Sequence, residues 1–279
     1  MSDDLFDITG RIILITGASS GIGAYLAQGL AARGAARVYA VGRREAQLAS
    51  VAAASPAIRP LVGDVSTIAG CKAVRDAFVE AEARAGVARE GVRLDLLVNN
   101  AGVKVEEGEW GADAAVEEVA ERLLAASDAS WAREFATNVG SVQWMTACVL
   151  PQLARAAQAG EGRGCVVVNT SVSAFLHKAP GTLYAASKAG AHSVAQSLAT
   201  HLTRRGVRVN SIAPANVPSE MNDPRDPHSF VARRAADIPA GRVGAPEDVV
   251  GAVVYLASRA GSFVSGSVVK VDGGIVMIS

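Results

Sequence analysis

The chain has 279 residues, half of them hydrophobic, and a mean hydropathy of +0.24, which excludes an intrinsically disordered chain and suits one α/β domain over residues 1–279. Lysines plus arginines and aspartates plus glutamates number 27 each, giving no net charge. Neither sign forms a long block, so we expect no nucleic-acid partner.

Short apolar runs rich in β-branched residues alternate with helix-length stretches along the chain. The first run, 12–16, is followed by a predicted helix over 23–33. Further runs predict strands at 37–41, 58–62, 94–98, 165–170, 207–212 and 267–271. Because each run is hydrophobic throughout, we expect strands covered by helices on both faces, and therefore a Rossmann-type doubly wound parallel sheet of seven strands.

Two stretches break this alternation. Residues 104–130 are rich in acids and alanines, and residues 215–240 are rich in Pro, Asp and Arg. Both follow strands at the edge of the sheet where ligands bind, and long loops in compact domains are commonly functional. We expect a substrate lid at 215–240, and at 104–130 an inserted segment that is either a second lid or a solvent-facing helical decoration.

Cysteines and termini indicate where the protein works. Cys71, Cys148 and Cys165 are odd in number and form no CxxC pair, so we expect three buried, reduced thiols. The first ten residues are acidic where a secretion signal is basic and apolar, and no run approaches the ~18–20 apolar residues of a membrane span. We therefore expect a cytoplasmic protein without a membrane partner. The four histidines lack metal-ligand spacing, so no metal site is expected.

A glycine-rich turn follows the first predicted strand directly, and a predicted helix follows the turn. Its sequence is Thr16-Gly17-Ala18-Ser19-Ser20-Gly21-Ile22-Gly23. Glycines allow the backbone to turn sharply and to approach a pyrophosphate, and the helix offers unpaired N–H groups and the positive end of its dipole. This placement predicts a nucleotide-binding site.

The end of the second predicted strand indicates which nucleotide is bound. Gly42 stands where an acid would bond the ribose hydroxyls of NAD(H), and Arg43 and Arg44 follow it. Arginine forms charge-assisted, bidentate pairs with phosphate, so these residues favour NADP(H). The alternative for the two arginines is a solvated, basic start of a helix.

The motifs together resemble the short-chain dehydrogenase/reductase family over nearly the whole chain. In order, the matching residues are the TGxxxGxG turn at 16–23, Asp64-Val65, Asn99-Asn100-Ala101-Gly102, Asn138, Ser171, the Tyr184 and Lys188 pair, the 208–214 run and Val271-Asp272-Gly273-Gly274. One marker departs from the pattern, since Ser20 precedes Gly21 where many NADP(H)-preferring members carry a basic residue.

The resemblance implies a catalytic set of Asn138, Ser171, Tyr184 and Lys188. Tyr184 and Lys188 are four residues apart, so a helix places them on one face. A free tyrosine titrates near pH ~10, and one cation at ~4 Å supplies about the ~4 kcal/mol needed to bring it to neutral pH, so we expect Lys188, helped by an oxidised nicotinamide, to lower the pKa of Tyr184. Ser171 is expected to bond the substrate oxygen, and Asn138, at the start of a predicted helix over 139–159, to hold a water of the proton relay.

The cofactor residues come partly from the glycine turn and the arginines and partly from the resemblance. Asp64 is implied at the adenine edge, Asn99 and Gly102 at the riboses, and Val217 at the carboxamide. The full expected set is Gly17, Ser19, Ser20, Gly21, Ile22, Gly23, Arg43, Arg44, Asp64, Val65, Asn99, Ala101, Gly102, Tyr184, Lys188, Pro214, Val217 and Ser219.

The activity that the resemblance implies is NADP(H)-dependent reduction of a ketone or aldehyde, reversible to alcohol oxidation. Segments 212–221 and 238–246 are similar to β-ketoacyl reductases associated with rhamnolipid pathways and to natural-product ketoreductases, although Ala215 replaces the usual glycine. Apolar loops favour a hydrophobic substrate. Family members commonly form tetramers through the helices matching 139–159 and 185–205, so a homo-oligomer, tetramer or dimer, is expected. The alternatives are an NAD(H)-dependent alcohol dehydrogenase working oxidatively and a non-redox or nucleotide-sensing protein.

Overall fold

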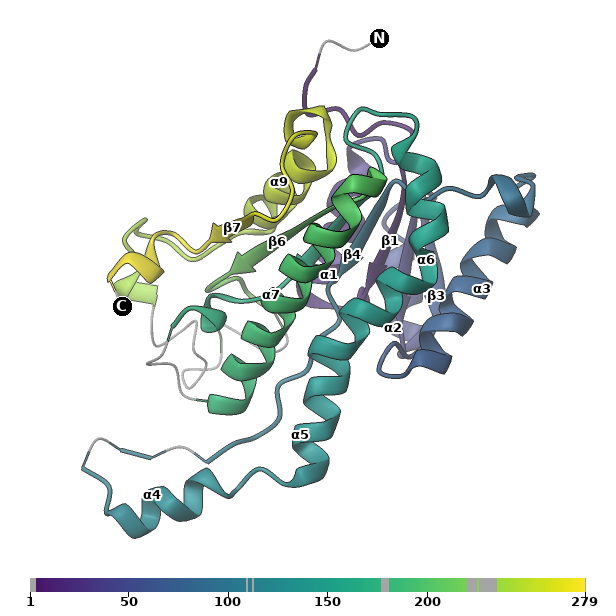
Figure 1. Cartoon of the computed structure of the whole chain (residues 1–279). Helices are drawn as coiled ribbons and strands as arrows, with labels where there is room; N and C mark the ends of the chain where they lie inside the picture. Colours follow the sequence, from purple (N-terminus) through teal and green to yellow (C-terminus); the bar gives the residue numbers. More distant parts are fainter. Residues whose placement is uncertain are drawn as a thin grey trace.

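One parallel sheet forms the centre of the molecule, with a layer of helices on each side (Figure 1). The computed structural model describes residues 4–108, 110–111, 113–176, 181–219, 225 and 235–278. The strands are β1 (Ile12–Thr16), β2 (Arg37–Gly42), β3 (Ile58–Val62), β4 (Leu96–Asn99), β5 (Cys165–Asn169), β6 (Arg208–Pro214) and β7 (Val268–Val271). Their order is β3-β2-β1-β4-β5-β6-β7, and all pairs are parallel. The predicted Rossmann-type sheet is confirmed.

The helices fill the crossovers between strands. They are α1 (Gly21–Ala32), α2 (Glu45–Ala52), α3 (Ile68–Arg84), α4 (Val116–Leu123), α5 (Asp128–Phe135), α6 (Ser141–Ala157), α7 (Thr182–Leu202) and α9 (Pro246–Ala257). Short 3-10 turns lie at Arg89–Gly91, Val172–Ala174, Thr203–Arg205, Ala235–Asp237, Arg259–Gly261 and Ile275–Ile278. Helix α1 begins two residues earlier than the predicted helix, so the glycine turn runs straight into it.

Two apolar cores lie on the two faces of the sheet, because successive residues of a strand point to opposite sides. Ile13 and Ile15 of β1 belong to the core under α1 and α9. Leu14 belongs to the core under α3, α6 and α7, which includes Phe78 and Val149. Both cores are fully covered at the central strands, as the continuous apolar runs predict.

The expectation that every strand is covered on both faces is wrong for the two edge strands. In β3, Arg59 and Pro60 are exposed, and β7 is only partly buried. A strand at the edge of a sheet has a neighbour on one side only, and its outer residues reach past the flanking helices. Pro60 is tolerated there because an edge strand can leave one N–H position unpaired.

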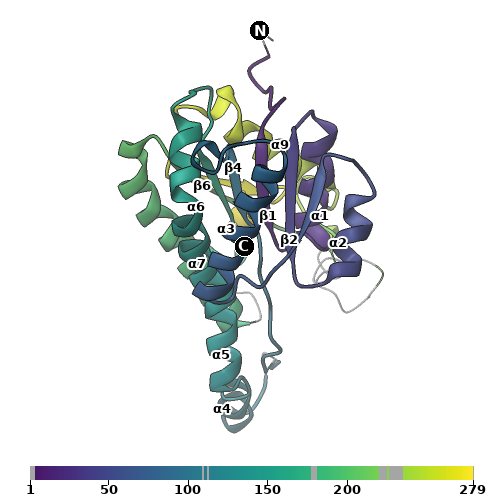
Figure 2. The ribbon, with the colours of Figure 1, turned by 90° about the vertical axis from the view of Figure 1, so that its right-hand side faces the viewer.

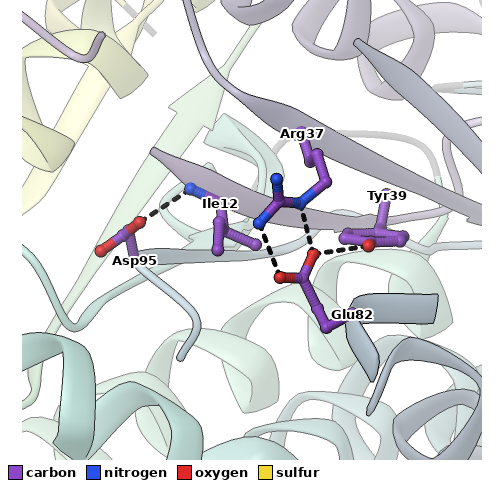
Figure 3. A network of polar contacts seen from close by, with 5 residues as sticks. All are labelled: Ile12, Arg37, Tyr39, Glu82 and Asp95. Carbon is purple, nitrogen blue, oxygen red and sulfur yellow. Dashed lines mark hydrogen bonds and ion pairs between the residues drawn. The ribbon is translucent and has the colours of Figure 1, made fainter. Parts of the chain in front are cut away.

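A buried polar network braces the amino-terminal ends of the strands, away from the edge where ligands bind (Figure 3). The Glu82 carboxylate on α3 accepts from Arg37 Nε and Nη2 at 2.6 and 2.7 Å and from the Tyr39 hydroxyl at 2.5 Å. Asp95, before β4, accepts from the Ile12 amide at 2.7 Å. Because these buried charges have partners inside the protein, we interpret the network as structural.

The carboxyl ends of β1 and β4 mark the point where the chain reverses direction across the sheet. From β1 the chain builds outward through β2 and β3, then returns to β4 on the other side. Loops diverge at such a point and leave a crevice in which ligands bind in open α/β sheets. The predicted site residues follow the ends of these strands.

Residues 104–130 leave this body as an arm, seen at the bottom of Figures 1 and 2. Helix α4 in the arm buries none of its residues, and α5 leads back toward α6. Within the part of the chain that the structure describes, no helix combines the length and the apolar composition that crossing a membrane requires.

The three cysteines are free thiols. Cys71 and Cys165 are buried, as expected, whereas Cys148 is only half-buried. It lies on α6 at the rim of the contact with α3, near the charges of Arg75 and Lys72. The prediction of three buried thiols is therefore wrong for Cys148.

Candidate active site and cofactor cradle

The glycine turn after β1 is closed by contacts that leave no room for side chains. Gly17 has a φ of +65°, and a Cβ there would lie 2.7 Å from Ala101 Cα. A Cβ on Gly23 would lie 2.3 Å from the Gly17 oxygen. The turn therefore packs against the start of the loop after β4, and its glycines are required by both conformation and space.

The helix behind the turn presents its amino terminus without a side-chain cap. Ser20 is the N-cap residue in an extended conformation, its side chain makes no capping bond, and the first turn contains no acid. These N–H groups and the helix dipole suit an anion. Ser219, after β6, packs against the glycine turn at Gly21. A Cβ on Gly21 would lie 3.0 Å from Ser219 Cβ.

Arg44 lies beside this turn at the end of β2. Its guanidinium donates from Nη2 to Ser20 Oγ at 2.7 Å and to Ser19 Oγ at 3.0 Å.

Asp64 lies after the end of β3, the next strand along the sheet. Its partial burial opposes ionisation, but hydrogen bonds from Ser66 and the charge of Arg43 outweigh this and lower the pKa of Asp64. Both arginines are thus gathered with the turn at one edge of the sheet.

Three predicted cofactor residues contribute to the cores as well. Ile22 packs against one core, Val65 is buried in the other, and Val217 is buried after β6. The Asn99 side chain is buried too, and its Nδ2 donates to Thr146 Oγ1 on α6 at 3.0 Å. The Asn99 side chain therefore ties β4 to α6, which leaves its backbone as the part expected at a ribose.

Asparagines that the sequence analysis did not assign link the strand ends. Asn100 Nδ2 donates to the Thr16 and Gly17 oxygens at 2.9 and 3.1 Å. Asn169 Nδ2, at the end of β5, donates to Asn100 Oδ1 at 2.7 Å. The ends of β1, β4 and β5 are thus held in a fixed relation, which positions the catalytic loop after β5. Polar residues at the ends of successive strands are the signal that could have found them.

Ser171, Tyr184 and Lys188 lie together at this edge of the sheet. Ser171 follows β5, where its Oγ accepts from the Ser173 amide at 3.1 Å, and it hydrogen-bonds with Tyr184. Tyr184 is in the first turn of α7, and Lys188 Nζ is 5.7 Å from the Tyr184 ring centroid. Lys188 Nζ donates to the Asn169 oxygen at 3.0 Å. The structure thus brings these three residues together.

Burial controls the protonation of the tyrosine and the lysine. It raises the pKa of Tyr184 to about 12, although the Ser171 hydrogen bond opposes this. It lowers the pKa of Lys188 to about 8, although the charge of Glu134 opposes this. Desolvation of the phenol has the larger effect within the protein, and the lowering of the Tyr184 pKa expected from Lys188 together with an oxidised nicotinamide stays a prediction.

Asn138 does not begin a helix, contrary to the sequence prediction. It lies inside a π-helical turn, Ala136–Gly140, which joins α5 to α6 without a break. Its Oδ1 accepts from the Val103 amide at 2.8 Å, and its Nδ2 donates to the Val103 oxygen at 2.8 Å and to Ser187 Oγ at 2.9 Å. Single π-helical turns inside α-helices are frequent at functional sites. Here the turn presents Asn138 to the loop after β4.

Gly102 separates Asn138 from Lys188. A Cβ on Gly102 would lie 3.4 Å from both Asn138 Oδ1 and Lys188 Nζ. Both polar groups therefore face the same small volume beside the backbone of the loop. An amide oxygen and an amine thus lie on either side of a position at which the chain carries no side chain.

Alternate residues of segment 103–107 contact α5, the π-helical turn and α7. Val103 pairs with Asn138, and the Val105 amide donates to Glu134 Oε2 at 3.0 Å. Glu107 Oε1 accepts from the Tyr184 amide at 3.1 Å. It supplies the cap that Gly181, the N-cap residue of α7, lacks. Sequence analysis missed Glu107 and Glu134, although Glu134 stands one helical turn before Asn138, a spacing that places both on one face.

An apolar wall stands beside Ser171. Val172, Ala215 and Ile275 are buried together, with Leu176 and Val276 packed against them. The Ala215 methyl, where the family pattern has glycine, contributes to this wall.

Of the predicted lid, only 215–219, 225 and 235–240 are among the described residues, and His177 lies outside them. In the described ranges, no three His, Cys, Asp or Glu side chains gather as metal ligands would.

Comparison with known proteins agrees with this geometry. A model of the short chain dehydrogenase family matches residues 11–229. The rhamnolipids biosynthesis 3-oxoacyl-[acyl-carrier-protein] reductase of Pseudomonas aeruginosa is 33% identical over an alignment of 274 positions, which covers 96% of this chain and 97% of that one. The short-chain dehydrogenase/reductase PhomF of Diaporthe leptostromiformis is 32% identical over 295 residues, covering 99% of this chain and 94% of that one.

A solved structure extends the similarity to three dimensions. The Pseudomonas aeruginosa RhlG/NADP active-site complex superposes with a TM-score of 0.80, at 33% identity and 98% coverage of both chains. The similarity therefore spans the sheet, the glycine turn and the loops of the site together.

Proposed function

Because this chain belongs to the short-chain dehydrogenase family of oxidoreductases, we propose that it reduces a ketone or aldehyde with NADPH. The observation that carries the proposal is the meeting of Ser171, Tyr184 and Lys188 beside the glycine turn. A protein that only senses a nucleotide has no need of a tyrosine and a lysine gathered beside a serine hydroxyl. These residues therefore favour catalysis over the alternative of a non-redox protein.

The cradle at the strand ends fits a dinucleotide. Side chains at Gly17 and Gly23 would fill the turn, and the amino terminus of α1 is uncapped, as pyrophosphate binding requires. Arg44 and Arg43 would bind a 2′-phosphate, since guanidinium groups pair with phosphate oxygens. Position 42 is a glycine, so no carboxylate stands there to repel the phosphate. When bound, NADPH would supply the hydride that reduces the carbonyl carbon.

Tyr184 is the proton donor in this proposal. Its hydroxyl gives a proton to the carbonyl oxygen as the carbon is reduced, so that the carbonyl becomes an alcohol. Ser171 donates a hydrogen bond to the same oxygen and stabilises its developing charge. Tyr184, whose pKa burial raises, is protonated at neutral pH and is therefore available as the acid.

Lys188 and Asn138 return the proton. The Lys188 ammonium, held by the Asn169 oxygen, stabilises the phenolate that remains after transfer. Asn138 Oδ1 faces the same volume beside Gly102 and holds the water through which the proton is replaced. The tyrosine thus regains its proton without exposure of the site to bulk solvent.

The substrate class we propose is apolar. Val172, which follows Ser171 in the chain, packs with Ile275 and Leu176 in an apolar wall. Apolar ligand surface against such a wall is worth about 25 cal/mol per Å² buried. β-Ketoacyl thioesters and bulky ketones are the compounds that would use it, in line with the similarity to a 3-oxoacyl-[acyl-carrier-protein] reductase.

The test begins with titration of NADPH and NADH into the purified protein, followed by oxidation of each cofactor with β-ketoacyl thioesters, cyclic ketones and polyol-derived ketones. We expect tighter binding of NADPH and turnover of the apolar ketones. Arg44→Ala should weaken NADPH binding about 10- to 100-fold and leave NADH unchanged, because it removes charge-assisted hydrogen bonds to phosphate. The exposed Arg204→Ala is the control. A preference for NADH in the unaltered protein would favour the NAD(H)-dependent alternative.

A further inference from the structure

Glu134 is a fully buried carboxylate that no step above uses. It lies in the last turn of α5, one helical turn before Asn138. Burying an ionised carboxylate is costly unless hydrogen bonds and an opposite charge compensate for it. The groups that contact Glu134 therefore indicate its role.

Three donors converge on this carboxylate. Oε2 accepts from the Val105 amide at 3.0 Å, and Oε1 accepts from Ser187 Oγ at 3.0 Å and from Asn138 Nδ2 at 3.4 Å. Ser187 Oγ in turn accepts from Asn138 Nδ2. It also lies 2.8 Å from the backbone carbonyl oxygen of Tyr184. An acceptor of three donors suits an ionised carboxylate, which holds both the relay asparagine and the residue beside Lys188.

The charges facing Glu134 come from two elements. Lys188 on α7 is an opposite charge, and Glu107 in segment 103–107 is a like charge. Tyr184, also on α7, is the third titratable group coupled to it. Burial raises the pKa of Glu134, with Glu107 acting in the same direction, while the Val105 and Ser187 hydrogen bonds and Lys188 oppose this. For Lys188, Glu134 is the charged group that opposes the effect of burial.

We propose that Glu134 is a positioning residue of the catalytic site, which fixes Asn138 and Ser187 and supplies the negative charge that balances the Lys188 ammonium. This inference rests on the proposed function, because it assigns Glu134 a role in the same proton relay. It predicts that loss of the charge affects the protonation of Lys188 and not only the stability of the fold.

A matched control exists on the far side of the sheet. Glu82 is also a fully buried glutamate that accepts several hydrogen bonds, but from Arg37 and Tyr39 at the opposite ends of the strands. Glu82→Gln therefore imposes the same chemical change at an equally buried place outside the catalytic machinery. An effect of Glu134→Gln that Glu82→Gln does not show belongs to the site.

The first measurement is direct and needs no turnover. Lysine ε-carbons are labelled with ¹³C, the Lys188 signal is identified by its loss in Lys188→Met, and its titration is followed by NMR. We expect a midpoint near pH 8 in the unaltered protein and a midpoint at least one pH unit lower in Glu134→Gln, since an adjacent charge shifts a titration by 1–3 units. Glu134→Asp, which keeps the charge, should give an intermediate value. Glu82→Gln should not move it.

The second measurement is the pH profile of kcat/KM for ketone reduction. Glu134→Gln should move the alkaline limb to lower pH and reduce kcat about tenfold at pH 7, with little change in KM, because substrate does not touch Glu134. If Glu134→Gln fails to fold, Glu134→Asp is measured in its place, and smaller shifts in the same direction are expected. A folded variant with unchanged Lys188 titration and an unchanged profile would overturn the inference. Turnover that survives Tyr184→Phe would instead overturn the proposed function, and the NMR titration would still decide the role of Glu134.

Discussion

Replacing Lys188 with methionine should make the protein more stable at neutral pH. Lysine ordinarily titrates at 10.5, and burial lowers the pKa of Lys188 to about 8. Below pH 8 both folded and unfolded chains carry this proton, so the folded state bears the full cost of the buried ammonium. Between pH 8 and 10.5 the folded state has released the proton while the unfolded state retains it, so stability rises with pH through this window.

The magnitude follows from the size of that pKa change. A lowering from 10.5 to about 8 corresponds to about 3 kcal/mol of unfavourable free energy for the ammonium at pH 7. Methionine has a similar length and helix propensity but no charge. It also loses the 3.0 Å hydrogen bond to the Asn169 oxygen, worth about 1 kcal/mol. The variant should therefore gain about 2 kcal/mol at pH 7.

The assay is urea unfolding at fixed protein concentration at pH values from 6 to 10, since association would otherwise alter the apparent stability. The advantage of Lys188→Met should be constant below pH 8 and should shrink as the pH rises above it. Lys72→Met, at an exposed position on α3, should change stability by less than about 0.5 kcal/mol at every pH. A Lys188 variant that is less stable than the unaltered protein at pH 7, by an amount independent of pH, would refute the reasoning.

Three further substitutions test the framework of the site. Gly23→Ala places a Cβ 2.3 Å from the Gly17 oxygen, so it should destabilise the fold by about 1–3 kcal/mol and weaken NADPH binding. Gly251→Ala, with open space around it, is the control and should change neither quantity. Urea unfolding and NADPH titration measure the two effects. Gly102→Ala meets its neighbours at 3.4 Å, so its melting temperature should be unchanged while kcat falls about tenfold; unchanged kcat would argue against the relay. Glu82→Gln should lower the free energy of unfolding by about 3 kcal/mol, and a smaller loss than 1 kcal/mol in urea would show that the network is dispensable.

Local patterns in the sequence predicted most of the fold. The strand runs are short, apolar and β-branched, so each predicted strand lies within two residues of the observed one. The exceptions arise where tertiary position decides the outcome. The exposure of β3 follows from its place at the edge of the sheet, and the π-helical turn around Asn138 follows from pairing with Val103.

The placement of the candidate site residues followed from the sequence, but their energetics did not. The structure brings Ser171, Tyr184 and Lys188 together, because one strand end and one helix fix their spacing, and their catalytic roles stay predictions. Their protonation depends on burial and on Glu134, which reaches them from a different helix. No local pattern in the sequence encodes such a contact. The homo-oligomer and the cytoplasmic location stay predictions.

The most direct test of the central claim is transfer of deuterium to an apolar ketone from NADPH that carries deuterium at both C4 positions of the nicotinamide, read by mass spectrometry of the alcohol. The account predicts one deuterium on the carbinol carbon with the unaltered protein and with the control Tyr255→Phe. With Tyr184→Phe it predicts at least a thousandfold slower transfer, since the proton donor is lost. Equal transfer by Tyr184→Phe, or alcohol without deuterium, would contradict it.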